Sequence, residues 1–218
     1  MTPFDLTSTT PLPPAFFARP TEIVARELVG KVLVSRVGES VAAGRIVETE
    51  AYLGADDPGS HAATRGITAR NRVMYGPPGH LYVYVVYGMH CMLNLVTEPE
   101  GVAGAVLVRA IEPLFGIDTM SARRGGAIGT ALSDGPAKVA AALGVTLAHN
   151  GMALGDALAV LSAPPFEDEV VASGRIGLAE GHDLPLRFYL HGDPHVSRGR
   201  TGPRPPRRRP DAPTEETA

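Results

Sequence analysis

The sequence predicts an α+β fold, a single domain with a mostly antiparallel curved sheet, a projecting β-hairpin and several flanking helices. Strand-like apolar runs separated by turn residues recur along the chain, at residues 31–37, 42–53, 81–96 and 103–112. The run at 81–96 is interrupted near Tyr87-Gly88-Met89, as expected for a hairpin turn. No internal repeat is visible, so one domain accounts for the pattern.

The first half of the domain is expected to begin with one helix and two strands. Pro20-Thr21 precede an apolar periodic run that stops at Gly30, which predicts a capped helix of about two turns. Residues 31–37 and 42–53 then alternate as strands do, with a short Gly-containing turn between them.

The second half follows an irregular stretch at residues 56–78, which contains many Gly and Pro residues. Pro136 suits the first position of a helix that Gly144 ends, because the first helical N–H needs no partner. The other expected elements are the hairpin at 81–96, a strand at 103–112, a helix ending near residue 125, and strands near 157–161 and 186–190.

Both ends of the chain are expected to lie outside the domain, which is assigned to residues 16–197. Residues 1–15 are rich in Pro and Thr and predict a flexible N-terminal arm. Residues 198–218 hold six arginines, three acids and repeated prolines, a composition typical of a disordered tail.

The bulk composition bounds the class of protein. Net charge is −3, and residues 1–197 alone carry 14 Lys and Arg against 20 Asp and Glu, so a nucleic-acid site needs local clustering of cations. No apolar run approaches the ~20 residues of a membrane span, and the N-terminus lacks the pattern of a signal peptide. The single Cys91 excludes an intramolecular disulfide and a multi-cysteine zinc site. We expect a soluble, cytoplasmic, monomeric protein with no membrane association.

Residues 44–94 hold five of the six tyrosines beside paired carboxylates, which marks this stretch as the candidate site. Alternation gives the strand at 45–53 two faces: Val47, Thr49, Ala51 and Leu53 toward the core, and Ile46, Glu48, Glu50 and Tyr52 on the other. A carboxylate two residues from a tyrosine places a proton acceptor beside a flat stacking surface. The alternative is an ordinary solvated strand face.

The hairpin carries three more tyrosines. Tyr82 and Tyr84 point the same way, and core packing is the preferred interpretation for Tyr82. Tyr87 lies at or beside the turn, where small polar residues are usual. A projecting Tyr87 with Met89 is suited to wedging between stacked bases.

Histidines and basic side chains in this half of the chain need separate interpretations. A metal site is conceivable from His61, His80 and His90 with Asp56 or Asp57. Their spacing matches no ligand pattern, so neither a metal nor another cofactor is expected. The candidates for contacts to phosphates are Arg65, Arg70, Arg72 and Lys138. Lys138 follows the start of a helix in G-P-A-K, and for the loop arginines a solvated loop is the alternative.

Several motifs together resemble one enzyme family. They are R-I-V-E-T-E-A-Y-L-G, D-P-G-S-H, T-A-R-N-R-V-M-Y-G, P-P-G-H-L-Y-V-Y-V-V-Y-G-M-H-C-M-L-N, V-L-V-R-A-I-E-P-L, G-P-A-K, R-I-G and P-L-R-F. The chain resembles the alkyladenine (3-methyladenine) DNA glycosylase family over about residues 16–197, with the motifs in the family's order. Gly59 and Ala137 stand where Ala and Gly are expected, and neither affects the chemistry.

The resemblance implies a metal-free, single-domain DNA repair enzyme that acts on double-stranded DNA containing damaged bases. It would flip a damaged purine out of the helix and hydrolyse the bond to deoxyribose. The implied roles are Glu50 as the base that activates water, Arg109 and the Ile176 carbonyl as its holders, Tyr52, His61 and Tyr84 as the base pocket, Asn94 as an obstacle to guanine, and Tyr87 with Met89 as the intercalating pair.

This interpretation requires that Glu50 be accessible to water and that the hairpin tip lie near the pocket. Two rivals stay open: a sugar hydrolase using Glu48 and Glu50 as a pair, and a binding module that stacks bases without cutting. The pair would be only about 7 Å apart on one strand face, a poor geometry for flanking a bond. Lys31 and Lys138 are the only lysines and lie outside the tyrosine-rich stretch, which predicts a monofunctional enzyme without a Schiff base.

Overall fold

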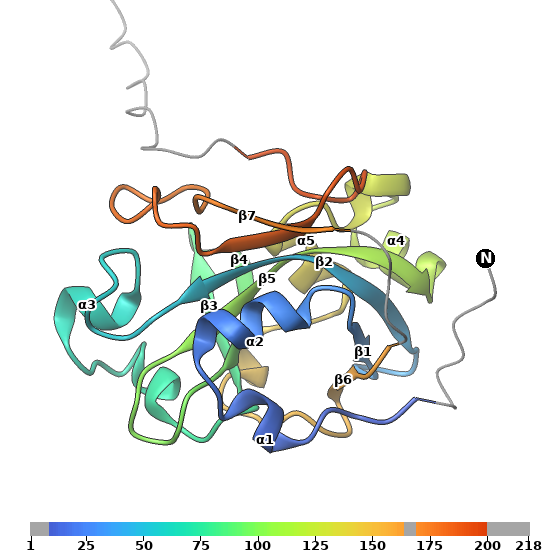
Figure 1. Ribbon diagram of the computed structural model, residues 1–218. Coiled ribbons are helices and arrows are strands. Elements are labelled where there is room, and N and C mark those ends of the chain that lie inside the picture. Colours follow the sequence, from blue (N-terminus) through green and yellow to red (C-terminus); the bar gives the residue numbers. More distant parts are fainter. Residues whose placement is uncertain (1–8, 164–168, 200–218) are drawn as a thin grey trace, which may run out of the picture.

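The computed structural model describes residues 9–163 and 169–199, which form a curled sheet flanked by short helices (Figure 1). All strand pairs in these residues are antiparallel, in the order β3-β4-β5-β2-β1-β6, with β8 pairing β2 and β7 pairing β8. The α+β prediction is confirmed. The strands are β1 (Val32–Ser35), β2 (Ala42–Tyr52), β3 (Leu81–Val86), β4 (His90–Val96), β5 (Ala105–Phe115), β6 (Leu158–Leu161), β7 (Val170–Ser173) and β8 (Arg187–Leu190).

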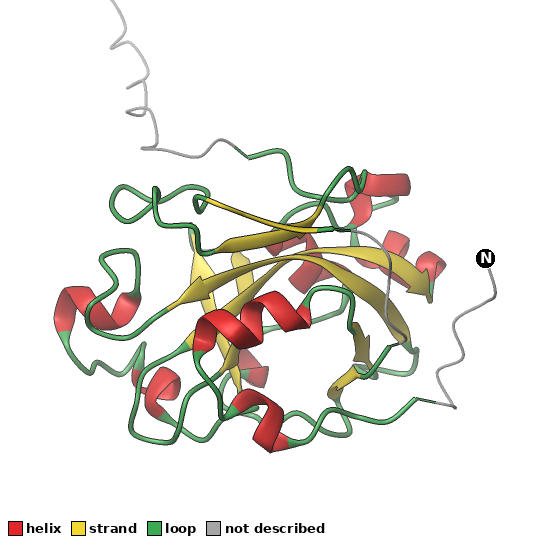
Figure 2. Cartoon of the chain, viewed as in Figure 1, coloured by secondary structure: helices red, strands yellow, loops and turns green. Residues whose placement is uncertain are grey.

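Short helices precede the first strand and lie in several of the connections between strands (Figure 2). The α-helices are α1 (Pro14–Phe17), α2 (Thr21–Leu28), α3 (His61–Arg65), α4 (Ile117–Arg123) and α5 (Pro136–Ala142), and the 3₁₀ turns are η1 (Arg72–Tyr75), η2 (Gly129–Leu132) and η3 (Leu147–His149). Val24, Ala25 and Leu28 of α2 are fully buried in the main core. The expected cap at Thr21 is wrong in detail, because Thr21 is the first helical residue and its hydroxyl contacts Thr97 and Glu98, each at 2.8 Å.

Strand β2 pairs with three other strands of the sheet. It pairs with β5 on one edge and with β1 and then β8 on the other. A Cβ at Gly44 would lie 2.8 Å from the side chain of Ile111 and from the Glu112 carbonyl oxygen, so this close approach requires glycine. A register shift between Ile46 and Glu48 marks a bulge opposite β5, just before the candidate site.

The predicted core face of β2 is confirmed, but the opposite face is also buried. Thr49 donates a hydrogen bond to the Ala25 carbonyl oxygen of α2 at 2.8 Å, so this face lies against α2. Ile46, Glu48 and Glu50 on the other face are fully buried as well. The two carboxylates contact Arg109 of β5, Arg187 of β8, Ser197 and the Ile176 N–H, which rules out the solvated strand face.

Several short elements were missed at the sequence level, among them α1 and the 3₁₀ turns η2 and η3. Residues 56–78 contain α3 and η1, and Ser60 caps α3 by accepting a hydrogen bond from the Ala62 N–H. Strand β7 was also missed, because it is only four residues long and pairs with β8 alone. Helices α2, α4 and α5, strands β1 to β6 and strand β8 lie within a few residues of the expected ranges.

The two ends of the chain run along the domain before leaving the described residues. Leu12 of the expected arm donates a hydrogen bond to the Val160 carbonyl oxygen at 2.8 Å, and Phe17 is buried. Residues 1–8 of the expected arm and 200–218 of the expected tail lie outside the described residues. Among the described helices, none has the length and apolar character needed to cross a membrane.

Candidate active site

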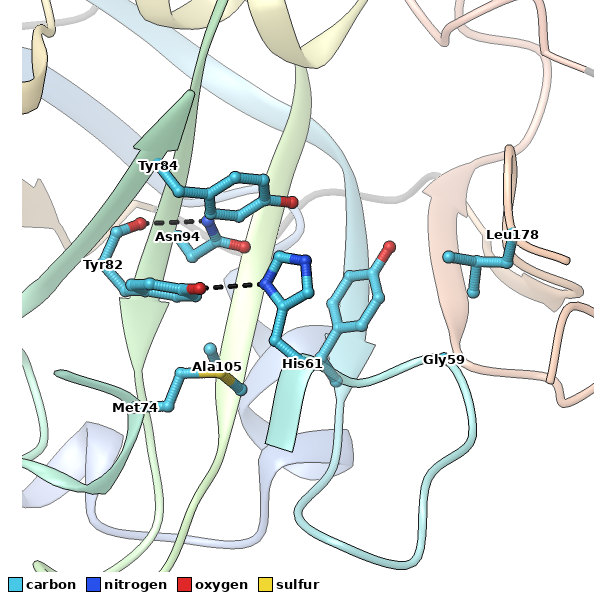
Figure 3. Close-up of a pocket in the computed structure, with 9 residues that line it drawn as sticks. Gly59, His61, Met74, Tyr82, Tyr84, Asn94, Ala105 and Leu178 are labelled. Carbon is cyan, nitrogen blue, oxygen red and sulfur yellow. Dashed lines mark hydrogen bonds between the residues drawn. The ribbon is translucent and has the colours of Figure 1, made fainter. Parts of the chain in front are cut away.

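An aromatic pocket opens where β2, α3 and the β3–β4 hairpin meet (Figure 3). Its volume is about 60 Å³, enough for a few water molecules. The lining residues are Tyr52, Gly59, His61, Met74, Tyr82, Tyr84, Asn94, Ala105 and Leu178. The structure therefore brings together Tyr52, His61, Tyr84 and Asn94, all of which the sequence placed in the base pocket.

His61 packs edge to face against Tyr84, whereas the rings of Tyr82 and Tyr84 are tilted by 38° to each other. His61 lies 4.7 Å from Tyr84 between ring centroids, at an interplanar angle of 74°, and Tyr82 lies 5.3 Å from Tyr84. The His61 Nδ1 and the Tyr82 hydroxyl are 2.9 Å apart (Figure 3). Tyr82 is buried as expected, yet it is also part of the pocket wall.

These rings are uncharged at neutral pH. Burial raises the pKa of Tyr82 to about 12, and burial, followed by the neighbouring phenol and Glu50, raises the pKa of Tyr84 further. Burial, then the positive charge of Arg70, lowers the pKa of His61. The pocket thus presents neutral, polarizable surfaces to any molecule that enters.

Hydrogen bonds fix the segment from Ser60 to Asn71, which carries His61. Ser60 caps the helix that begins at His61, and the Asn71 side-chain amide donates to the carbonyl oxygens of His61 and Gly66, at 2.9 and 2.7 Å. Asn71 is almost completely buried. Sequence reasoning missed Asn71, although it lies inside the T-A-R-N-R motif.

The carboxylate of Glu50 lies at the hydroxyl end of the Tyr52 side chain. The Tyr52 hydroxyl donates to its Oε2 at 2.7 Å, the Ile176 N–H donates to its Oε1 at 2.7 Å, and Arg109 Nη1 lies 3.2 Å from the same Oε1. Glu50 is 0% exposed, so the open access to water that was expected is not present in this arrangement. Ile176 contacts Glu50 through its N–H, whereas the sequence assigned a role to its carbonyl.

A second buried carboxylate, Glu48, organises the far side of this cluster. Arg109 Nε and Arg187 Nε donate to its Oε1 at 2.9 and 2.6 Å, and Ser197 contributes its backbone N–H and its hydroxyl. Burial by itself would raise the pKa of Glu48, but the two guanidinium groups outweigh it and hold the pKa below its usual value. Arg187 and Ser197 were missed, since no local motif links them to β2.

The buried ion pair of Arg175 and Asp57 lies beside the ring of Tyr52. Arg175 is fully buried, and its Nη1 and Nη2 contact the two carboxylate oxygens of Asp57 at 2.6 and 2.5 Å. The Arg175 guanidinium lies 4.8 Å from the Tyr52 ring centroid, a cation–π distance. Asp57 is therefore an ion-pair partner, and the described residues contain no group of three His, Cys, Asp or Glu placed to hold a metal ion.

Asn94 is held at the pocket wall by its own strand and its neighbour. Its amide nitrogen donates to the Tyr82 carbonyl oxygen at 2.9 Å, with a longer contact to the Met92 carbonyl oxygen at 3.4 Å. These bonds turn the side-chain oxygen toward the interior of the pocket (Figure 3). The position suits the expected role of Asn94 as an obstacle inside the pocket.

The hairpin tip projects as predicted. Tyr87 is 57% exposed and Met89 is 74% exposed, although both side chains are largely apolar. Tyr87 and Gly88 both have positive φ, 52° and 74°, as in the primed turns that suit tight hairpins. Since Tyr84 lies three residues before Tyr87, the tip and the pocket belong to the same short hairpin.

The predicted cations differ in their surroundings. Arg70 and Arg72 are exposed, and the Arg70 guanidinium lies 5.1 Å from the Tyr84 ring centroid. Lys138 Nζ contacts Asp134 at 2.5 Å, so it already has an anionic partner. Arg65 ends α3, and its side chain lies outside the described structure.

Comparison with known proteins identifies the class of enzyme. Residues 15–194 match the family model described as methylpurine-DNA glycosylase. A Methanoculleus marisnigri protein named "Putative 3-methyladenine DNA glycosylase" is 49% identical over 86% of this chain and 98% of its own length. A Chlorobaculum tepidum protein of the same name is 47% identical over 89% and 94%. The match over most of the chain shows a DNA repair enzyme of the glycosylase class, with DNA as its substrate.

The chain belongs to the methylpurine-DNA glycosylase family. The resemblance drawn from the motifs is thereby confirmed. The family match spans the pocket, the hairpin tip and both buried carboxylates, and it ends before Ser197.

Proposed function

We propose that this enzyme releases alkylated purines from duplex DNA by hydrolysing the N-glycosidic bond, and leaves an abasic site. The substrates would include 3-methyladenine, the base in the names of the relatives, and 7-methylguanine, with hypoxanthine and ethenoadenine as neutral candidates. One observation carries the proposal: the hydrogen bond between Tyr52 and Glu50 joins a buried carboxylate to the wall of an aromatic pocket.

Base extrusion needs compensation from stacking. Flipping a nucleotide costs a few kcal/mol, and least for a weakened pair. Stacking on aromatic rings returns roughly 1–3 kcal/mol per base, so Tyr52, His61 and Tyr84 can offset the cost. Tyr87 with Met89 would fill the space left in the helix. Because the pocket now holds only a few waters, it must widen before a purine enters.

The chemical step would use Glu50 as a general base. Alkylation at N3 or N7 makes the purine cationic and a good leaving group, so the enzyme mainly needs to activate water. Arg109 and the Ile176 N–H contact Oε1 of the Glu50 carboxylate and fix its orientation. The Tyr52 hydroxyl must release Oε2 before a water can bind there. Base catalysis of this kind contributes about 10²–10⁴-fold.

Other residues would orient or select the substrate. The side-chain oxygen of Asn94 in the pocket would obstruct the 2-amino group of normal guanine. Arg65 and Arg72 would contact phosphates near the flipped nucleotide. Lys138 would do the same after exchanging Asp134 for a phosphate oxygen.

The decisive experiment is Glu50→Gln, tested with a duplex that contains 7-methylguanine. We expect single-turnover base release to fall by at least about a hundredfold, while binding to the damaged duplex persists. Glu22→Gln on the exposed face of α2 is the matched control and should behave as the unsubstituted enzyme. Near-normal release by Glu50→Gln would show that Glu50 is not the base.

The same assay separates the rivals. A binding module would retain the damaged duplex without releasing a base. A carboxylate-pair mechanism would need Glu48 to donate a proton, and the lowered pKa of Glu48 keeps it ionised. Borohydride should trap no covalent DNA adduct, because Lys138 is paired with Asp134 and does not line the pocket. An adduct on either lysine would contradict the monofunctional assignment.

A further inference from the structure

A positive charge without an acidic partner lies at the aromatic wall of the pocket. Arg70, in the loop between α3 and η1, places its guanidinium 5.1 Å from the Tyr84 ring centroid. Among the ion pairs of the described residues, none involves Arg70. The ring of Tyr52 also has a guanidinium beside it, that of Arg175, but Asp57 forms an ion pair with Arg175. The two tyrosines therefore have different electrostatic surroundings.

The remaining charges near the pocket balance each other. Glu50 and Glu48 share Arg109, and Glu48 also pairs with Arg187, which gives two carboxylates and two guanidinium groups. All four are nearly or fully buried. Within the described structure, Arg70 is thus the charge left uncompensated beside the pocket.

The field of Arg70 extends across the pocket. After burial, Arg70 is the second cause that lowers the pKa of His61, and it opposes the burial that raises the pKa of Tyr82. Both effects on His61 disfavour a positive charge at that position. A cationic purine stacked between the pocket rings would experience the same unfavourable field.

We propose that Arg70 is a specificity-determining residue that disfavours cationic purines relative to neutral ones. The inference rests on the proposed function, since it concerns which bases the same pocket accepts. A cationic purine and the Arg70 guanidinium compete for the electron-rich ring of Tyr84 and repel each other. A neutral purine such as hypoxanthine can stack beside the guanidinium without that repulsion.

This role differs from the phosphate contact predicted from the sequence. Loss of a phosphate contact weakens binding of all DNA alike, whatever base is in the pocket. Loss of a charge beside the pocket changes the ratio between cationic and neutral substrates. The two roles are therefore separable in one assay.

The test compares Arg70→Gln with Arg72→Gln, which changes an exposed arginine two residues further on, at the start of η1. Single-turnover release is measured from otherwise identical duplexes containing 7-methylguanine or hypoxanthine. Arg70→Gln should raise the ratio of the cationic to the neutral rate by about two- to fivefold, the size of an exposed cation–π contact. The change should shrink at high salt, because the charge is exposed. Arg70→Lys, which keeps the charge, should restore a ratio close to that of the unsubstituted enzyme.

Arg72→Gln should lower both rates by a similar factor and leave the ratio unchanged. If Arg70→Gln also lowered both rates equally, or changed neither, the selectivity role would be wrong. If the unsubstituted enzyme released neither base and no 3-methyladenine, the proposed function would fail and the inference with it. Normal release with an unaltered ratio would overturn the role of Arg70 alone.

Discussion

At the scale of single residues, Glu48 shows how a buried charge is stabilised by its partners. It accepts hydrogen bonds from Arg109, Arg187 and Ser197, and these contacts hold its pKa below the usual value despite burial. Removing the charge of such a carboxylate strongly destabilises the protein, because its charged partners stay buried without compensation. Glu48 also fixes Arg109, which in turn contacts Glu50.

We predict that Glu48→Gln lowers the free energy of unfolding by about 3–5 kcal/mol at pH 7. Since the folded-state pKa of Glu48 is lowered, its stabilising contribution is complete above the unfolded-state value of about 4.3 and is lost as pH falls through the folded-state value. The difference between the two proteins should therefore narrow in acid, as measured by urea unfolding at pH 7 and at successively lower pH.

A difference that stayed constant with pH would contradict this account of Glu48. If Glu48→Gln does not fold, Ser197→Ala provides a milder test, because it removes only one hydroxyl from the same carboxylate. Loss of one hydrogen bond to a charged group should cost about 1.5–3 kcal/mol. No loss of stability in Ser197→Ala would mean that the hydroxyl contributes nothing to holding Glu48.

Sequence reasoning found many residues of the compact motifs but missed several of the residues that hold them in place. Tyr52, His61, Tyr84 and Asn94 lie in one pocket, as the motifs predicted. Arg175 and Arg187 were missed because each meets its carboxylate across more than a hundred positions of sequence. The burial of Glu50 was also unpredictable, because one of its contacts is with Ile176, which lies 126 positions further along the chain.

At the scale of elements, the β3–β4 hairpin combines two functions in few residues. Its buried part supplies Tyr82, Tyr84 and Asn94 to the pocket, while its tip exposes Tyr87 and Met89. Such exposure of large apolar side chains is unfavourable for packing and marks an interaction surface. The hairpin and its turn could be predicted because alternation and turn chemistry are local signals.

We predict that the double substitution of Tyr87 and Met89 by alanine leaves stability within about 0.5 kcal/mol, because neither side chain is buried. Base release from a stably paired lesion should fall by about tenfold or more, since nothing would fill the gap in the helix. The same lesion opposite an abasic position, which is already unpaired, should be affected less. Equal losses on both duplexes would contradict the wedge role of the tip.

At the scale of the whole molecule, residues 197–199 connect the candidate active site to the arginine-rich sequence that follows them. Ser197 contacts Glu48 through its backbone N–H and its hydroxyl, and a Cβ at Gly199 would lie 2.4 Å from Ile176, which itself contacts Glu50. The α+β class could be predicted from strand patterns alone. The contact between Ser197 and Glu48 of β2 could not be predicted, because it is a long-range contact that no local pattern encodes.

Residues 198–218 carry a net charge of +3, with six arginines and three acids, in a chain whose net charge is −3. Five of these six arginines follow Gly199, whereas residues 1–197 carry more acids than bases. Each phosphate neutralised by a protein cation adds about 0.9 to the slope of log affinity against log salt concentration. We therefore predict that a chain ending at Gly199 binds duplex DNA with a salt slope smaller by up to about 4.5, at unchanged melting temperature.

A chain ending at Val196 is the informative partner in this comparison. It lacks the same arginines, but it also lacks the two Ser197 contacts that hold Glu48. Its melting temperature should therefore fall, whereas its salt slope should match that of the chain ending at Gly199 to within the contribution of Arg198. Fluorescence anisotropy over a salt series and thermal unfolding measure the two effects separately. If the chain ending at Gly199 kept the full slope, the tail arginines would not neutralise phosphates, and the DNA-binding charge would have to come from the domain, where Arg65, Arg72 and Lys138 are the predicted contacts.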